Sequence, residues 1–262
     1  MLRLVINLDR SPDRLKAFQA TFSEKCPGLS FTRIQAVDGN KLTREQIESL
    51  LPPLGSGEKV DFLGQLVDTE VGCFLSHKKG WQTLLDSAEQ WALIMEDDIE
   101  LSPNAMFYIS NEHWIPEGEA IVQLHVSYNC SKILAHKSTK PLGNGRKLIR
   151  QYKPAPMGCL AYLINRKAAS LAITLSQKIP APVDDFLFQP YSSFRQHFET
   201  WTLSPAVVRP KSNVASTIGG PRKRARRKKN FTLTAHPVRI WRKIKRKCAC
   251  WFLCEKTTNS FK

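Results

Sequence analysis

The chain has 262 residues, 42% of them hydrophobic, so it is long enough to bury a sizeable core in one large domain or two small ones. Of its net charge of +16, thirteen positive charges come from residues 222–247, which contain no Asp or Glu, so the remaining residues together carry only +3. The cysteines number seven, an odd total, and the first four are scattered, which argues against a disulfide framework and for a reducing compartment. The sequence shows neither a signal-peptide pattern nor the roughly 18 to 20 consecutive apolar residues of a membrane span.

The start of the chain predicts a strand, a helix and a second strand. Residues 2–8 are largely apolar and predict a buried strand. Ser11 as the N-cap and Pro12 at the first helical position predict a helix start. A second strand is expected over residues 31–37, and the following residues 38–40 predict a turn. This order is typical of the opening of a nucleotide-binding α/β unit, although no glycine-rich phosphate loop accompanies it.

Two helices are expected next, separated by a loop. Thr43 and Gln46 have the spacing of a capping box at the start of a short helix over residues 43–50. Residues 52–65 are rich in glycine, proline and charge and predict a mobile loop. Thr69 is expected to cap a long helix. Apolar residues recur along that helix at helical spacing, namely Val71, Phe74, Leu75, Trp81, Leu84, Leu85 and Ala88.

His77, on this long helix, has two interpretations. Helical geometry alone favours a histidine satisfied in the core or at its boundary. Its position just before an acidic strand is also compatible with a role at a phosphate-bearing ligand.

Three consecutive acids, Glu96-Asp97-Asp98, follow the short apolar run of residues 92–95, which predicts a buried strand. In an open α/β sheet, ligands bind just beyond the carboxyl ends of the strands. Because adjacent carboxylates repel one another, a hard divalent cation such as Mg²⁺ or Mn²⁺, shared with a phosphate-bearing substrate, is a natural partner. The alternative is a solvated acidic turn.

The second half of the chain predicts a further series of elements. Asp184 and Asp185 stand at an expected helix start, where the helix dipole favours carboxylates whether or not they are catalytic. Pro205 and Pro210 favour an edge or terminal position for the last strand. In chain order we expect a helical or irregular piece over 104–110, a strand over 120–126, a polar loop over 138–146, a rigid turn over 154–158, a strand over 159–164, a helix over 165–177 and the last strand over 202–209.

Several short blocks stand in a fixed order along the chain: residues 6–14 (INLDRSPDR), 36–39 (AVDG), 70–77 (EVGCFLSH) with Trp81, 94–98 (IMEDD), 156–158 (PMG) with Ala161-Tyr162, and 182–184 (PVD). In this order they resemble glycosyltransferase family 25, the bacterial lipooligosaccharide galactosyltransferases and their relatives. The resemblance covers residues 1–217, which we expect to be a catalytic domain, and leaves out residues 218–262.

The resemblance implies an α/β fold of the GT-A type with a Rossmann-like nucleotide-binding half. It also implies a UDP-sugar donor, inversion at the anomeric carbon and transfer, with galactose as the expected sugar, to a lipooligosaccharide or lipopolysaccharide glycan. The acidic triplet matches the place of the family's metal-binding acids, so Asp98 and Glu96 are expected on Mn²⁺ or Mg²⁺. Donor-binding roles are expected for Asn7, Asp9, Arg14, Asp38, His77, Glu96 and Asp97.

The chemistry of glycosyl transfer suits these residue types. The leaving diphosphate gains charge as its bond to the sugar breaks, and a metal stabilises that charge as a Lewis acid. An inverting enzyme also needs one base that takes a proton from the acceptor hydroxyl. Asp184 and Asp185 are the candidates, and the sequence does not decide between them.

Two other functions use similar residues. A metal-dependent phosphoester hydrolase also has acidic clusters, but it normally adds histidines at separate strand ends, and the six histidines here do not cluster. A nucleic-acid-binding protein would use the basic residues 222–229 on phosphates, but no known binding module accompanies them. We therefore favour the glycosyltransferase and expect no nucleic-acid partner.

The basic tail, residues 218–262, has a physical partner of its own. Residues 236–251 interleave aliphatic residues and tryptophans with Lys and Arg, a pattern typical of segments that lie on an anionic bilayer. We therefore expect a cytoplasmic enzyme, peripheral on the inner face of the bacterial inner membrane, that meets a lipid-linked acceptor there. A solvated tail is the alternative, and the roles of Cys248, Cys250 and Cys254 stay open between small apolar residues, metal binding and lipidation.

Overall fold

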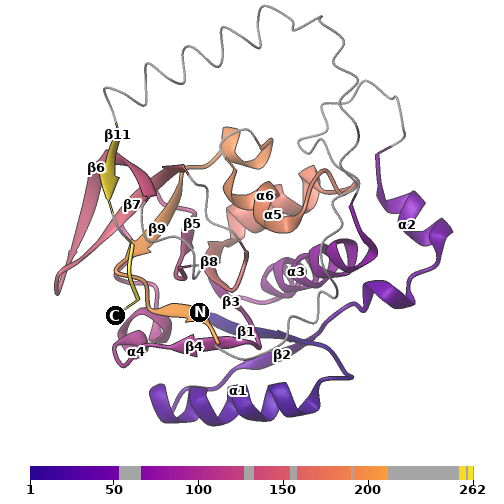
Figure 1. The fold of residues 1–262 in the computed structure, drawn as a ribbon, viewed down its shortest axis with the longest axis horizontal. Coiled ribbons are helices and arrows are strands. Elements are labelled where there is room, and N and C mark those ends of the chain that lie inside the picture. Colours follow the sequence, from indigo (N-terminus) through magenta and orange to yellow (C-terminus); the bar gives the residue numbers. More distant parts are fainter. Residues whose placement is uncertain are drawn as a thin grey trace, which may run out of the picture.

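A nine-stranded mixed sheet forms the centre of the computed structural model (Figure 1), which describes residues 1–52, 66–126, 133–153, 158–189, 192–211, 254–257 and 259–261. The strand order is β11-β6-β7-β9-β5-β8-β3-β1-β2. These strands are β1 Leu2–Asn7, β2 Thr32–Gln35, β3 Trp91–Glu96, β5 Ile121–Gln123, β6 Ile133–Gly143, β7 Arg146–Lys153, β8 Ala161–Asn165, β9 Thr200–Ser204 and β11 Cys254–Thr257. A separate antiparallel pair joins β4 Ile99–Leu101 to β10 Val208–Pro210.

The parallel part of the sheet is built from the first half of the chain. Strand β1 pairs in parallel with β2 on one side and with β3 on the other. The register places Ile6 beside Glu96 and Asn7 beside Gln35, so the carboxyl ends of the three strands meet at one edge of the sheet. The predicted strand–helix–strand opening and the α/β class, with its Rossmann-like half, are confirmed.

Helices cover both faces of this part of the sheet (Figure 1). Alternate residues of β1 enter two different cores: Leu4 packs with residues of α3, and Val5 packs with residues of α1. A strand buried on both faces is apolar throughout, which explains the unbroken apolar runs. The helices are α1 Pro12–Lys25, α2 Arg44–Leu50, α3 Asp68–Asp86, α4 Ala105–Ser110, α5 Arg166–Leu175 and α6 Val183–Phe188, with 3₁₀ turns η1 Gly39–Lys41 and η2 Phe194–Gln196.

Two helices begin as the sequence predicts, and a third does not. Helix α1 begins at Pro12, and the Thr43–Gln46 capping box at α2 is present. The expected cap at Thr69 is wrong, because α3 begins at Asp68 with Val67 as its N-cap. There the Glu70 carboxylate accepts a hydrogen bond of 3.1 Å from the backbone N–H of Val67, so an acid in the first turn replaces the missing hydroxyl cap.

The predicted polar loop over residues 138–146 is also wrong. These residues belong to the hairpin of β6 and β7, which turns through Asn144 and Gly145 with φ of 50° and 70°. Asn-Gly is the commonest sequence for a two-residue hairpin turn because both positions need positive φ. The signal was therefore present, but the polar strands around it concealed the alternation that identifies a strand.

The predicted last strand over residues 202–209 is two strands, β9 and β10, in different sheets. Strand β9 lies between β7 and β5, so an edge position is wrong for β9, whereas β10 with Pro210 lies at an edge of its two-stranded sheet with β4. Pro205 lies just beyond the end of β9, where the sheet does not need its missing N–H.

The final described residues return to the body of the protein. Strand β11 pairs antiparallel with β6 at one edge of the sheet. The carbonyl of Ser260 accepts a 2.7 Å hydrogen bond from the N–H of Ala206, and the Arg209 guanidinium lies 4.5 Å from the centre of the Phe261 ring. The division at residues 217 and 218 stays a prediction, because the structure does not describe residues 212–253.

Residues 53–65 and 154–157, expected as a loop and a turn, also lie outside the described residues. The basic residues 222–247 and the amphipathic segment 236–251 do so too. Among the helices that are described, none has the length and apolar character required to cross a membrane.

Two glycines of α3 give a matched test of its packing. A Cβ on Gly72 would lie 2.5 Å from the backbone N of Gly39 and 2.7 Å from the carbonyl of Val37, whereas a Cβ on Gly80 would meet the flexible Cδ1 of Ile94 at 3.1 Å. We expect Gly72→Ala to lower the free energy of unfolding in urea by about 1–3 kcal/mol or more, because backbone must move. Gly80→Ala should be close to neutral, because Ala favours the helix by up to about 1 kcal/mol. Equal losses would show that contact with η1 does not require glycine at residue 72.

Candidate functional site

A cleft opens at the joint carboxyl edge of β1, β2 and β3, and the first half of α3 forms one of its walls. Parallel strands bring their ends together, which is why side chains separated by up to ninety residues meet here. Seven of the residues expected from the sequence line the cleft, namely Asn7, Arg14, Asp38, His77, Glu96, Asp97 and Asp98.

Asp97 is held by the protein itself. Its carboxylate accepts a 2.6 Å hydrogen bond from the side-chain amide of Asn7 and forms an ion pair with Arg14. The residue is only 9% exposed, and burial raises the pKa of its carboxyl while the bond from Asn7 opposes that rise. Asp97 therefore joins β3 to β1 and α1, a positioning task that differs from the expected contact with the donor.

The two carboxylate oxygens of Asp98 differ in their contacts. Its Oδ2 lies 3.1 Å from the guanidinium of Arg14, whereas no donor among the described residues reaches its buried Oδ1. Burial, followed by the charge of Glu96, raises the pKa of Asp98 to about 6. A buried carboxylate oxygen without a partner, beside a second acid, fits the hard oxygen ligands that Mg²⁺ and Mn²⁺ prefer.

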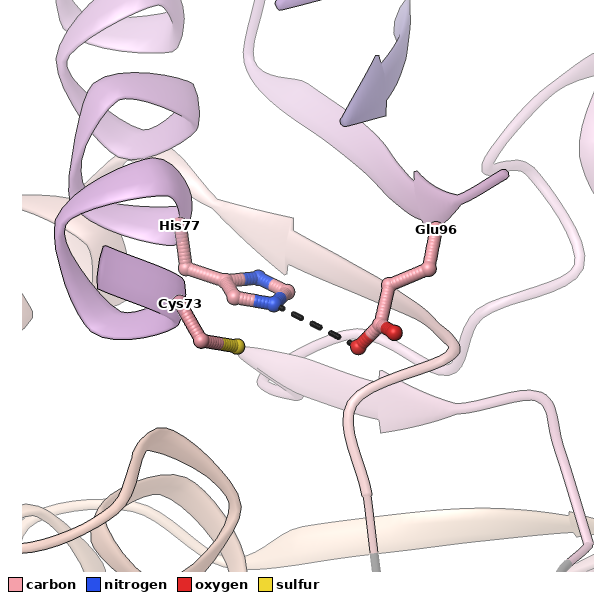
Figure 2. A group of neighbouring side chains, drawn as sticks. All are labelled: Cys73, His77 and Glu96. Carbon is pink, nitrogen blue, oxygen red and sulfur yellow. Dashed lines mark ion pairs between the residues drawn. The ribbon is translucent and has the colours of Figure 1, made fainter. Parts of the chain in front are cut away.

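His77 satisfies both interpretations at once. Its Nδ1 lies 3.0 Å from the hydroxyl of Tyr162, which also accepts a 2.9 Å hydrogen bond from the indole N–H of Trp81. Its Nε2 faces the cleft and lies 3.7 Å from Oε1 of Glu96, as Figure 2 shows together with Cys73. One edge of the ring is thus satisfied in the core, and the other edge faces the ligand space.

Asp9 and Asp38 have different environments. Asp38 lines the cleft and forms an ion pair with Arg10. The carboxylate of Asp9 instead accepts hydrogen bonds of 2.5 Å each from Arg33 and Gln35, and the bond from Arg33 lowers its pKa. Asp9 is absent from the residues that line the cleft, so its expected role at the donor is not supported by the geometry and stays a prediction.

The two candidate bases lie in the first turn of α6. Asp184 accepts hydrogen bonds from the backbone N–H of Gly158 at 2.9 Å and of Asp185 at 3.0 Å, whereas Asp185 accepts one from the side chain of Gln189 at 3.0 Å. Burial, followed by the charges of Glu96 and Asp184, raises the pKa of the Cys73 thiol well above its ordinary range. The charge of Asp184 thus acts on a cleft residue, although Asp184 is absent from the residues that line the cleft.

The cleft residues that the sequence did not identify as site residues include Cys73 and Ser76. Cys73 and Ser76 line the cleft from α3, one helical turn apart. The hydroxyl of Ser76 accepts from the N–H of Val37 at 2.8 Å and donates to the carbonyl of Gly72 at 2.7 Å, so it fixes the end of β2 against α3. Their spacing with His77 puts all three on one face of the helix, a signal that the sequence contains.

Residues 1–187 match the family described as "Glycosyltransferase family 25 (LPS biosynthesis protein)". This range covers well over half of the chain and includes every expected site residue.

The relatives come from animals and bacteria. The chain is 27% identical over 203 residues to "Glycosyltransferase 25 family member" of Drosophila pseudoobscura pseudoobscura, with 76% of this chain and 31% of that protein covered. It is 25% identical over 215 residues to "Lipooligosaccharide biosynthesis protein lic2B" of Haemophilus influenzae, with 79% and 74% covered. It is 35% identical over 96 residues to "Procollagen galactosyltransferase 1" of Danio rerio, with 36% and 16% covered.

The chain spans about a third of the length of the two Drosophila proteins that it matches. Among solved structures, it is similar to "a glycosyltransferase involved in the glycosylation of the major capsid of PBCV-1", with a TM-score of 0.41, 9% identity, and coverage of 82% of this chain and 95% of that one.

Asp98 makes the stability of the protein depend on pH. Its folded pKa of about 6 exceeds the ordinary value of 3.8, so between these values the folded protein binds more protons than the unfolded chain, and its stability falls as the pH rises from about 4 to about 6. Asp98→Asn should remove this part of the decline. It should raise the free energy of unfolding at pH 7, without added metal, by at most about 3 kcal/mol.

Urea titrations of both proteins at pH 4 and pH 7 measure this difference. If the free energy of unfolding changed equally with pH in the wild type and the variant, a buried carboxyl with a raised pKa at residue 98 would be contradicted.

Proposed function

The chain belongs to glycosyltransferase family 25, and on that premise we propose that it transfers a sugar from a UDP-sugar donor to a lipooligosaccharide or lipopolysaccharide glycan, with inversion at the anomeric carbon. The observation that carries the proposal is the acidic end of β3 in a cleft, where Asp98 keeps a buried oxygen without a partner among the described residues. Galactose is the sugar we propose, supported by the name of the zebrafish relative, and the glycan acceptor by that of the Haemophilus relative.

In this proposal the acids of β3 divide their tasks. Asp98 and Glu96 hold Mn²⁺ or Mg²⁺, which when bound supplies Lewis-acid stabilisation of the diphosphate that leaves. Arg14, held by Asp97 and Asp98, keeps a positive charge beside these acids and limits their repulsion. The ends of β1 and β2, with Asn7 and Asp38, form the part of the cleft where an α/β sheet receives a nucleotide.

Asp184 is our proposed base. As the acceptor hydroxyl attacks the anomeric carbon from the face opposite the departing UDP, its proton passes to the Asp184 carboxylate. Support comes from the charges of Glu96 and Asp184, both of which, after burial, raise the pKa of the Cys73 thiol. Asp185, which accepts a hydrogen bond from the side chain of Gln189, is the alternative base.

The test of the donor and metal assignments is a screen of UDP-sugars with the full chain, with UDP release as the readout. We expect activity with UDP-galactose that disappears in EDTA and returns with Mn²⁺ or Mg²⁺. Asp98→Asn should abolish nearly all transfer while the protein stays folded by circular dichroism. Full activity in EDTA would refute the metal assignment, and hydrolysis of phosphoesters without transfer would favour the hydrolase alternative.

Asp184→Asn and Asp185→Asn separate the two candidate bases. We expect Asp184→Asn to lower kcat by on the order of 10²- to 10⁴-fold, because a base in proton transfer contributes that much. Binding of UDP should change little, since the donor side is untouched, and Asp185→Asn should retain most of its activity. Loss of UDP affinity in Asp184→Asn would assign this acid to the donor site instead.

We also propose that the enzyme is cytoplasmic and peripheral on the inner face of the bacterial inner membrane, where it meets a lipid-linked acceptor. The support is compositional: thirteen Lys and Arg in residues 222–247 without an acid. Each basic residue near an anionic surface contributes about 1 kcal/mol before screening. The attraction falls off within a Debye length of about 8 Å at physiological salt, so binding should weaken as salt rises.

Vesicle sedimentation tests the membrane proposal. Because β11 and residues 259–261 pack on the body, truncation would remove structural contacts, so the suitable variant changes the basic residues of 222–247 to Gln in the full chain. It should lose sedimentation with anionic vesicles and retain transfer to a small soluble acceptor. Sedimentation equal to that of the wild type would remove the membrane role.

A further inference from the structure

Cys73, His77 and Glu96 bring three different metal-ligating atoms together at the base of the cleft. The Cys73 sulfur, a His77 ring nitrogen and a Glu96 carboxylate oxygen all lie within 4.8 Å of one another. Cys73 and His77 are four residues apart on α3 and therefore share one face of the helix, while Glu96 reaches them from the end of β3 (Figure 2).

The hydrogen bonding of His77 indicates a ligand, because one of its ring nitrogens has no hydrogen-bond partner in the described part of the chain. The residue is 0% exposed, and nothing in the described part of the chain bonds to its Nε2, the nitrogen that faces Glu96. Ligation through Nε2 would require the ring proton on Nδ1, which lies 3.0 Å from the hydroxyl of Tyr162 and would donate to it. Histidines that bind metals almost always donate their second N–H to such a partner, which fixes the orientation of the ring.

The ligand set differs in kind from the one proposed for the donor diphosphate. A thiolate, an imidazole and a carboxylate suit a borderline cation such as Zn²⁺, whereas Mg²⁺ and Mn²⁺ prefer oxygen ligands. Four carboxylates act on the Cys73 thiol, those of Glu96, Asp184, Glu70 and Asp98, and together they attract a cation to this point. On coordination the thiol proton passes to the solvent.

We propose that Cys73, His77 and Glu96 form a Zn²⁺ site at the base of the cleft, with three protein ligands and an open fourth position. The site stands on its own geometry, and its consequence for catalysis rests on the proposed function. Glu96 is also a proposed ligand, with Asp98, of the Mn²⁺ or Mg²⁺ that serves the donor diphosphate. Zn²⁺ bound here therefore makes Glu96 unavailable to that ion. Zn²⁺ therefore inhibits transfer even when Mn²⁺ is present.

Binding of Co²⁺ and Zn²⁺ to the full chain tests the site without any assay of transfer. Co²⁺ alone should produce the near-ultraviolet absorption of a thiolate–cobalt bond, and Zn²⁺ should abolish it by displacement. Cys73→Ser should remove this absorption, and both Cys73→Ser and His77→Gln should weaken Zn²⁺ binding in calorimetry by at least about 10-fold. Thermal unfolding without metal identifies any variant that fails to fold.

Two other buried cysteines serve as controls. Cys26→Ser, at the end of α1, and Cys159→Ser, which lies near Cys73, should retain the cobalt spectrum. Asp98→Asn should also retain it, although the same change is expected to abolish transfer, so failure of the proposed function and failure of the Zn²⁺ site are distinguishable. A wild-type spectrum without a thiolate band, or an unchanged spectrum in Cys73→Ser, would overturn the proposal.

Discussion

The ion pair between Arg14 and Asp97 allows three consecutive carboxylates to stand at the end of a buried strand. Without a cation, Glu96, Asp97 and Asp98 would repel one another in a site where burial already disfavours the charges of Asp97 and Asp98. Arg14 reaches both Asp97 and Asp98 from α1, and the amide of Asn7 completes the contacts of Asp97 from β1. The same contacts fix α1 and β1 against β3, so the geometry of the cleft and the balance of its charge depend on one cluster.

The three acids of the cleft differ in how fully the protein compensates their negative charge. Asp97 is neutralised within the protein, while Asp98 and Glu96 keep oxygens that face the ligand space. The raised pKa of Asp98 shows that the folded protein tolerates an unfavourable charge at neutral pH. This cost agrees with the metal site that we propose, since the binding free energy of an ion would offset it.

Much of the first half of the fold could be predicted because its signals are local. The apolar runs of β1 and β3, the start of α1 at Pro12 and the capping box at Thr43 are each encoded within a few residues. Convergence of the strand ends then follows from parallel pairing alone.

The β6–β7 hairpin and β11 were not predicted from the sequence. Their polar sequences contain no apolar alternation, and β11 becomes a strand only by pairing with a partner more than a hundred residues away.

Prediction from the sequence has the same limit for single side chains of the site. Asp97 and Asp98 are chemically identical neighbours, and the sequence assigns both to the donor or its metal. In the structure, Arg14 contacts both carboxylates, but the amide of Asn7 bonds to Asp97, while Oδ1 of Asp98 has no partner among the described residues. Successive residues at a strand end point in different directions, so only one of the two faces Asn7, ninety positions earlier in the chain. His77 has the same duality within one ring, because the Tyr162 hydroxyl, which accepts a hydrogen bond from Trp81, lies at its Nδ1 while its Nε2 faces Glu96. Residue types at a strand end thus predict the class of chemistry, and only the tertiary partners decide which oxygen or nitrogen is left to perform it.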